Sequence, residues 1–121
     1  SVNNAESLRH RTKNFALMVI KLCQSLHRTH EARVLSDQLL RAGTAVAANY
    51  RAACRGRSRA EFIAKLGIVV EEADETVFWC EILEESGLVD HRDIDALLNE
   101  ARELLSIFAA SQKTADREDP E

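Results

Sequence analysis

The stretch that most constrains the fold of this chain lies between residues 29 and 56, where apolar side chains recur on nearly every side of a predicted helix. Its main stripe repeats every three or four residues, which places those side chains on one helical face. A helix that is apolar on most sides is normally buried, and a chain of 121 residues has few other elements to cover it. We therefore expect this helix to contact a neighbouring subunit as well as its own core. The stripe consists of Leu35, Leu39, Ala42, Val46, Asn49 and Ala53.

The composition favours helices along the whole chain. One Pro and four Gly are few for this length, and contents of 45% apolar and 30% charged residues are ordinary for a globular domain. No run approaches the roughly 18 apolar residues of a membrane span, and the first residues lack the apolar core of a signal peptide. We expect one cytoplasmic domain without membrane contact, in which the three cysteines are reduced.

Periodicity and capping signals predict four helices, at about residues 5–27, 30–55, 59–86 and 91–111. Asn3, Thr29 and Ser58 are suitable N-caps, and Gly56 is suited to end the second helix with a left-handed residue. Short connections force neighbouring helices to be antiparallel. The predicted fold is all-α, an antiparallel up-down-up-down four-helix bundle over residues 1–111. Residues 112–121 are polar and end close to a proline, and are predicted to be a disordered acidic tail.

Charge is divided between the two halves of the chain. Residues 1–59 carry eleven Lys and Arg against three acidic residues, a net +8, and residues 60–121 carry five against seventeen, a net −12, which together give the −4 of the whole chain. Basic helices could pack beside acidic ones and guide assembly. The basic half could instead form a surface for nucleic acid, with the acidic half turned away. Both interpretations stay open at this point.

Four arginines gather around the connection between the second and third helices, and they are the candidate nucleic-acid-binding residues. Guanidinium groups form two parallel hydrogen bonds to phosphate. Tyr50 is the one aromatic residue close to them for base stacking, so sequence-specific recognition of a single strand is not indicated. The alternative is that the arginines pair with carboxylates of the third and fourth helices. The four are Arg51, Arg55, Arg57 and Arg59.

Apolar side chains outside the main stripes form a candidate oligomer interface. They lie on one flank of the second predicted helix and on one side of the third, and the third includes the only tryptophan. The candidates are Leu40, Ala47, Tyr50, Ile68, Trp79 and Ile82. Asn49 lies inside the apolar stripe, where a buried amide needs a partner. We expect it to bond Glu75 or a backbone group and so to fix the register of the helices.

No pattern in the chain supports an enzyme. No Glu precedes a His by three residues, the spacing found in di-iron bundles. His27 and His30 lie on either side of a predicted loop, so they do not share a helical face. No glycine-rich phosphate loop is present. We therefore assign no catalytic residue, metal ligand or cofactor, and expect a non-catalytic protein.

The second and third helices carry a motif of spaced residues: Leu39, Arg41, Ala42, Asn49, Ser58, Glu61, Phe62, Leu66 and Glu75. By this motif the chain resembles the four-helix-bundle proteins encoded in intervening sequences of bacterial 23S rRNA genes, over about residues 10–110. It is also similar to the accessory variability proteins of diversity-generating retroelements. The chain departs from the family pattern where that pattern often has Ser, Pro, Glu and Gly. The departures are Ala45, Ala47, Ala52 and Ala53.

The resemblance implies a homo-oligomer, with a pentamer favoured, and the retroelement relatives imply binding of nucleic acid and of a reverse transcriptase. The expected function is a non-catalytic oligomeric adaptor that binds nucleic acid, or a reverse-transcriptase-type partner, through an arginine-rich rim. The alternative is a purely structural or protein-interaction homo-oligomer without nucleic-acid binding.

Overall fold

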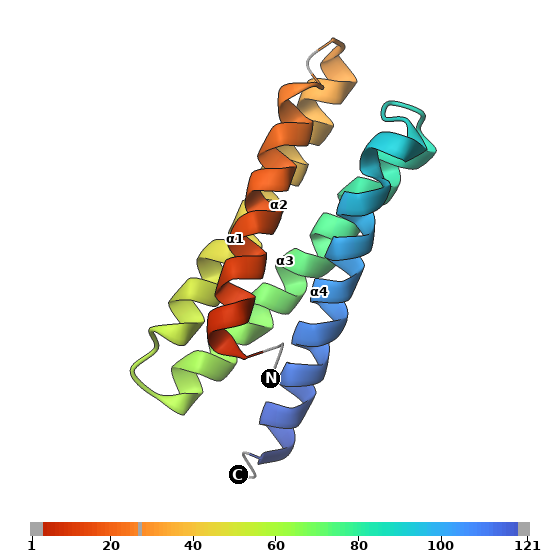
Figure 1. The fold of residues 1–121 in the computed structure, drawn as a ribbon. Helices are drawn as coiled ribbons and strands as arrows, with labels where there is room; N and C mark the ends of the chain where they lie inside the picture. The colour runs from red at the N-terminus through yellow and green to blue at the C-terminus, as the bar shows by residue number, and fades with distance from the viewer. Residues whose placement is uncertain (1–3, 27, 119–121) are drawn as a thin grey trace.

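A computed structural model describes residues 4–26 and 28–118, which form four α-helices and no strand (Figure 1). The helices are α1 (Ala5–Gln24), α2 (His30–Cys54), α3 (Arg59–Glu85) and α4 (His91–Glu118). Neighbouring helices run antiparallel, so α1 begins and α4 ends beside the α2–α3 turn (Figure 1). The predicted all-α, up-down-up-down four-helix bundle is confirmed.

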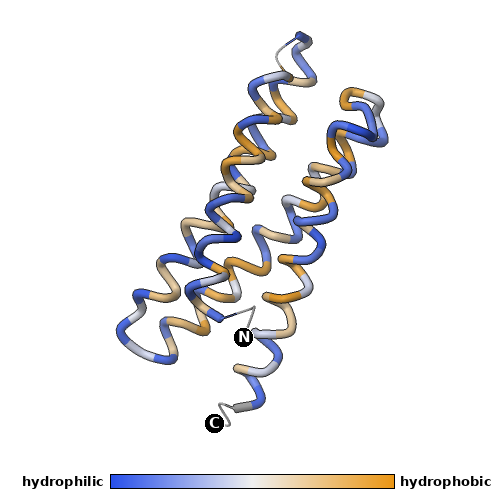
Figure 2. Tube along the Cα trace, viewed as in Figure 1, coloured by the Kyte–Doolittle hydropathy of each residue, from blue (hydrophilic) through white to orange (hydrophobic). Residues whose placement is uncertain are grey.

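Each helix packs against two others, in the cyclic order α1, α2, α3, α4. The α2–α3 contact is the most extensive and the α1–α4 contact the least. Apolar residues recur along all four helices (Figure 2), and the stripe that faces inward fills the core. Over the residues described, none of the helices combines the length and apolarity needed to cross a bilayer. The largest fully buried side chains include Phe15, Phe108, Leu39, Leu66 and Leu83.

Three helices begin at a polar cap. The side-chain oxygens of Asn4, Thr29 and Ser58 accept hydrogen bonds from the backbone N–H three residues further on, at 2.8, 3.1 and 3.1 Å. Thr29 and Ser58 are confirmed as caps. The cap of α1 is Asn4 and not the predicted Asn3, which lies outside the described residues.

The helix ends differ from the predictions by small amounts. α2 and α3 each end one residue earlier than predicted. α1 ends at Gln24, and the predicted end at His27 falls on a residue outside the description. Among the described glycines only Gly87 has a positive φ, of 79°. The prediction that Gly56 adopts a left-handed conformation is therefore wrong. α2 nevertheless ends at Cys54, two residues before Gly56.

The predicted disordered tail is wrong for residues 112–118, because α4 continues to Glu118. Ala115 is buried, with 7% of its surface exposed, and its carbonyl accepts a hydrogen bond of 3.2 Å from Nη2 of Arg59. Phe108, Gln112 and Ala115 keep the spacing of four and three that continues a helical stripe, and no proline intervenes before residue 120. The bundle thus extends past residue 111, and residues 119–121 lie outside the description.

Candidate nucleic-acid interface

The buried polar groups of residues 4–26 and 28–118 are all accounted for within the bundle. In the described residues every buried side-chain nitrogen or oxygen has a hydrogen-bond partner. Burial raises the pKa of the Cys23 thiol to about 11 and that of Cys80 to about 12, so both stay protonated at neutral pH. Within the same residues no three His, Cys, Asp or Glu side chains are placed to hold a metal ion. Binding chemistry must therefore be sought on the surface.

The structure divides the four candidate arginines into two groups, all of them exposed. Arg51 and Arg55 lie one turn apart near the end of α2, on the side that faces α1. Arg57 lies in the α2–α3 turn, and Arg59 is the first residue of α3. Arg59 reaches the carbonyl of Ala115 in α4. The predicted cluster is thus a rim with two sides: Arg51 and Arg55 line a cavity between α1 and α2, and Arg59 lines a separate one between α3 and α4.

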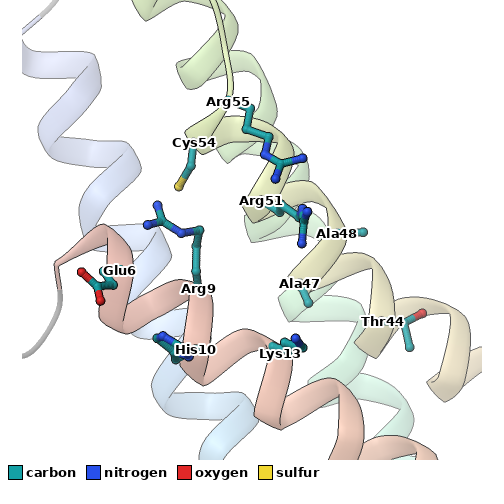
Figure 3. Close-up of a pocket in the computed structure, with 10 residues that line it drawn as sticks. All are labelled: Glu6, Arg9, His10, Lys13, Thr44, Ala47, Ala48, Arg51, Cys54 and Arg55. Atoms are coloured by element: carbon teal, nitrogen blue, oxygen red, sulfur yellow. The ribbon is translucent and has the colours of Figure 1, made fainter.

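That cavity is a groove between α1 and α2 with a volume of about 740 Å³. Four cations line it: Arg9 and Lys13 on α1, Arg51 on α2, and Arg55 at the C-cap of α2 (Figure 3). In Figure 3 the guanidinium of Arg9 points toward α2, near Cys54. The remaining lining residues are Glu6, His10, Thr44, Ala47, Ala48 and Cys54. We call this set of residues the basic groove.

Four arginines elsewhere in the bundle bind carboxylates, whereas among the described residues the arginines of the groove bind none; Arg28, Arg33 and Arg117 likewise make no ion pair there. Across the helices, Arg11 binds both carboxylate oxygens of Glu100, at 2.8 and 3.2 Å. Arg41 contacts Glu72 and Glu75, Arg92 contacts Asp90, and Arg102 contacts Glu81. Within the part of the chain that the structure describes, the remaining rim and groove cations make no ion pair: Arg9, Lys13, Arg51, Arg55 and Arg57. The alternative that the rim arginines are consumed by carboxylates of α3 and α4 is wrong, within one chain, for Arg51, Arg55 and Arg57.

The charge division of the sequence corresponds to the two helical hairpins. The basic half forms α1 and α2, and the acidic half forms α3 and α4. Glu6 is the single carboxylate in the groove lining, against four permanent cations. The groove is therefore positive and lies on the positive hairpin, which favours an anionic ligand over a cationic or neutral one.

The candidate interface residues of α3 are exposed or half-buried, and Trp79 also packs against the core. Ile68 is 37% exposed, and Trp79 and Ile82 are half-buried. Phe78, which the sequence did not single out, is 48% exposed and packs edge-on against Trp79 with ring centroids 4.9 Å apart. These four residues form an apolar strip, which we call the α3 strip.

The candidates on α2 are less exposed than predicted. Leu40 and Ala47 are half-buried, and Leu40 packs against the core. Tyr50 is only 4% exposed, and its ring lies 4.9 Å from that of Phe108. Tyr50 as an interface residue is therefore a wrong prediction, because the ring points inward and fills the core between α2 and α4.

Asn49 is half-buried, and its Nδ2 donates to the carbonyl of Ala45, one turn back on α2, at 2.9 Å. Of the two partners considered, the backbone group is thus the one observed. Glu75 is also only half-buried, and its carboxylate binds Arg41 and accepts a bond of 3.3 Å from the Trp79 indole. The two residues predicted as one buried polar pair belong to separate contacts.

Fold and surface together define a small antiparallel four-helix bundle with a cationic groove on one hairpin. The chain belongs to the family of 23S rRNA-intervening sequence proteins, whose family model matches residues 7–110. It is also similar to the crystal structure of a protein of unknown function from the S23 ribosomal protein family of Bacteroides thetaiotaomicron VPI-5482. The two are 31% identical, over 90% of this chain and 97% of the other, with a TM-score of 0.81. No curated protein matches the chain.

Arg9 and Lys13 were not among the residues selected from the sequence. On α1 they lie off the apolar stripe, which is also what an ordinary solvated face looks like. Their spacing of four residues equals that of Arg51 and Arg55, and in antiparallel helices two such pairs can face each other. That matched spacing is the one sequence signal that could have revealed them.

Proposed function

We propose that this protein is a non-catalytic, oligomeric adaptor that binds nucleic acid through its arginine-rich rim. The binding surface comprises Arg51, Arg55 and Arg57 and is extended onto α1 by Arg9 and Lys13. Its ligand chemistry is the phosphodiester backbone, since guanidinium groups match phosphate geometry. The proposal places the protein in the cytoplasm.

One observation carries this proposal. The guanidinium groups of four arginines elsewhere in the bundle bind carboxylates, whereas those of Arg51, Arg55 and Arg57 bind none among the described residues. Cations without intramolecular partners are free to bind phosphate without first breaking an ion pair. Exposed unpaired cations on a hairpin of net positive charge are what backbone binding requires.

Self-association is the second part of the proposal. In the α3 strip Ile68 and Phe78 are exposed, Trp79 and Ile82 are half-buried, and the rings of Phe78 and Trp79 pack together. Such an apolar and aromatic composition is typical of an interface centre. We expect a second copy of this chain to cover it. A pentamer is the state that the family resemblance suggests, and a reverse-transcriptase-type enzyme is the protein partner it suggests.

Mobility-shift titration tests the nucleic-acid part. The protein should bind structured RNA and DNA at about 50 mM salt and bind much more weakly at about 200 mM, because counterions are released when phosphates are contacted. Replacing Arg51, Arg55 and Arg57 together with Glu should abolish the shift. Absence of any shift by the unchanged protein at the lower salt concentration would refute the proposal.

The exposed α3 strip also favours a second candidate, a purely structural homo-oligomer without nucleic-acid binding. In that case the rim arginines would pair with carboxylates of a neighbouring copy. Changing Arg55, Arg57 and Arg59 together to Glu would then dissociate the assembly. Light scattering coupled to size exclusion separates the candidates, because the adaptor keeps its mass when the rim is reversed and the structural oligomer does not.

A further inference from the structure

We infer that the basic groove is a binding site for one strand of nucleic acid, held by consecutive phosphates and not by its bases. The inference rests on the proposed function for the class of ligand and adds the site and the strandedness. The rim arginines alone would accept any phosphate surface. The groove selects among such surfaces by its shape.

The width of the groove favours a single strand. Packed helices lie roughly 8–10 Å apart. α1 and α2 approach each other closely where Gly43 of α2, which has no side chain, faces Val19 of α1. An extended strand lying in such a groove meets the α1 wall and the α2 wall together. A double helix, whose major groove alone is about 12 Å wide, is too wide to enter such a groove and would rest on its edges.

The spacing of the cations also fits a strand. Arg9 and Lys13 are four residues apart, as are Arg51 and Arg55, which is about 6 Å along each helix axis. That step is comparable to the separation of neighbouring phosphates along an extended strand. Each wall therefore offers a pair of cations at about the spacing of two neighbouring phosphates.

The rest of the lining indicates which part of the ligand is not read. The lining contains no Phe, Tyr or Trp, and Tyr50 is turned into the core. The imidazole of His10 is the one ring in the lining, so the groove lacks the series of aromatic side chains on which many single-strand-binding proteins stack successive bases. Ala47, Ala48 and Thr44 are small and leave the space open. Recognition should depend on the backbone and show little preference among base sequences.

The groove can be tested with fluorescent oligo(dT) and oligo(U), which form little secondary structure, and with a mixed-sequence duplex of equal length. Neutralising four phosphates on a single strand predicts a slope of about −2.8 for log K against log salt. Affinity for both single strands should then fall about 50-fold between about 50 and 200 mM salt. The duplex should bind more weakly than either strand at the lower salt concentration.

Two double variants test the walls separately: Arg9→Glu with Lys13→Glu on α1, and Arg51→Glu with Arg55→Glu on α2. Each should weaken single-strand binding at least tenfold at low salt and reduce the magnitude of the slope to about 1.4. A matched control reverses Lys21 and Arg33, which are exposed cations on the same two helices outside the groove. The control should keep the slope of the unchanged protein.

Cys54 provides a readout that needs no charge reversal. It lines the groove and is half-buried, whereas Cys23 and Cys80 are buried. A bound strand should slow alkylation of Cys54 by at least fivefold, and the duplex should not. This measurement keeps the inference falsifiable if a double variant fails to fold.

The outcomes separate the two proposals. Binding of duplex as tight as that of single strands, with the α1 variant behaving like the control and Cys54 unprotected, would refute the groove and leave nucleic-acid binding by the rim intact. No binding of any of the three probes would refute both.

Discussion

The close contact between α1 and α2 leads to a specific prediction about Gly43. A Cβ at this position would lie 2.8 Å from Cγ2 and 3.2 Å from Cγ1 of Val19. Val19 is fully buried and β-branched, so it has one favoured rotamer on a helix and cannot turn aside. Gly43→Ala should gain about 1 kcal/mol of helix propensity but lose about 2 kcal/mol to overpacking. The net loss is about 1 kcal/mol, or roughly 3–5 °C in Tm.

The partner variant removes the obstacle. Val19→Ala alone should cost about 2 kcal/mol because it leaves a cavity. In that background Gly43→Ala no longer meets the valine methyl groups and should stabilise the protein by about 1 kcal/mol. The double-mutant cycle should therefore give a coupling energy of about 2 kcal/mol between the two positions.

Urea unfolding followed by far-UV circular dichroism measures these values, at one protomer concentration because association also contributes to stability. Gly67→Ala is the matched control on α3. Its Cβ would lie 3.2 Å from Nε2 of Gln112, the end of a flexible side chain, so this change should stabilise by up to about 1 kcal/mol. If Gly43→Ala were as stabilising as Gly67→Ala, with no coupling to Val19, the close contact would not constrain the hairpin as argued.

Three further predictions follow from the ends and seams of the bundle. Nδ1 of His91 lies 2.5 Å from Oε2 of Glu84, and this bond, together with the charge of Asp95, raises the pKa of His91 above 6.5. The contribution of protonated His91 to stability is therefore complete below pH 6.5 and is lost as the pH rises through the raised pKa. His91→Gln should thus flatten the fall in Tm between about pH 6 and pH 9, and an unchanged pH profile would contradict this role. Arg11 and Glu100 link α1 to α4, the two packed helices with the least contact. A double-mutant cycle in which both are replaced with Ala should therefore give a coupling energy of about 1 kcal/mol by urea unfolding. A coupling energy near zero would mean that the ion pair does not stabilise the bundle. Truncation after residue 111 should cost about 1 kcal/mol or more through the loss of buried Ala115, and truncation after residue 118 should leave the Tm unchanged; equal effects of the two would mean that the last two turns of α4 do not support the bundle.

Most of the fold could be predicted from the sequence because local signals agreed with one another. Thr29 and Ser58 mark helix starts by side-chain chemistry that acts within three residues. The end of α4 is harder to predict because residues 112–118 are mostly polar, although the spacing from Phe108 to Ala115 continues the helical stripe. Capping and periodicity are local properties, whereas Ala115 is buried through contacts with distant parts of the chain.

The candidate site could be predicted only on one side. Arg51 and Arg55 stood out because they are close in sequence. Arg9 and Lys13 did not, because their place opposite α2 depends on how far one helix is shifted along the other. Tyr50 shows the same limit, since a residue at the edge of a stripe turns inward or outward according to its neighbour, here Phe108.

The separation of charge between the two hairpins gives the bundle a permanent electric dipole across its width. A polyanion that approaches in solution exerts a torque on such a molecule and turns α1 and α2 toward itself before any contact forms. This alignment acts over about 8 Å at physiological ionic strength and about 30 Å at 0.01 M. Association should therefore be faster in dilute buffer than the area of the groove alone would allow, and adding salt should slow the approach as well as loosen the complex.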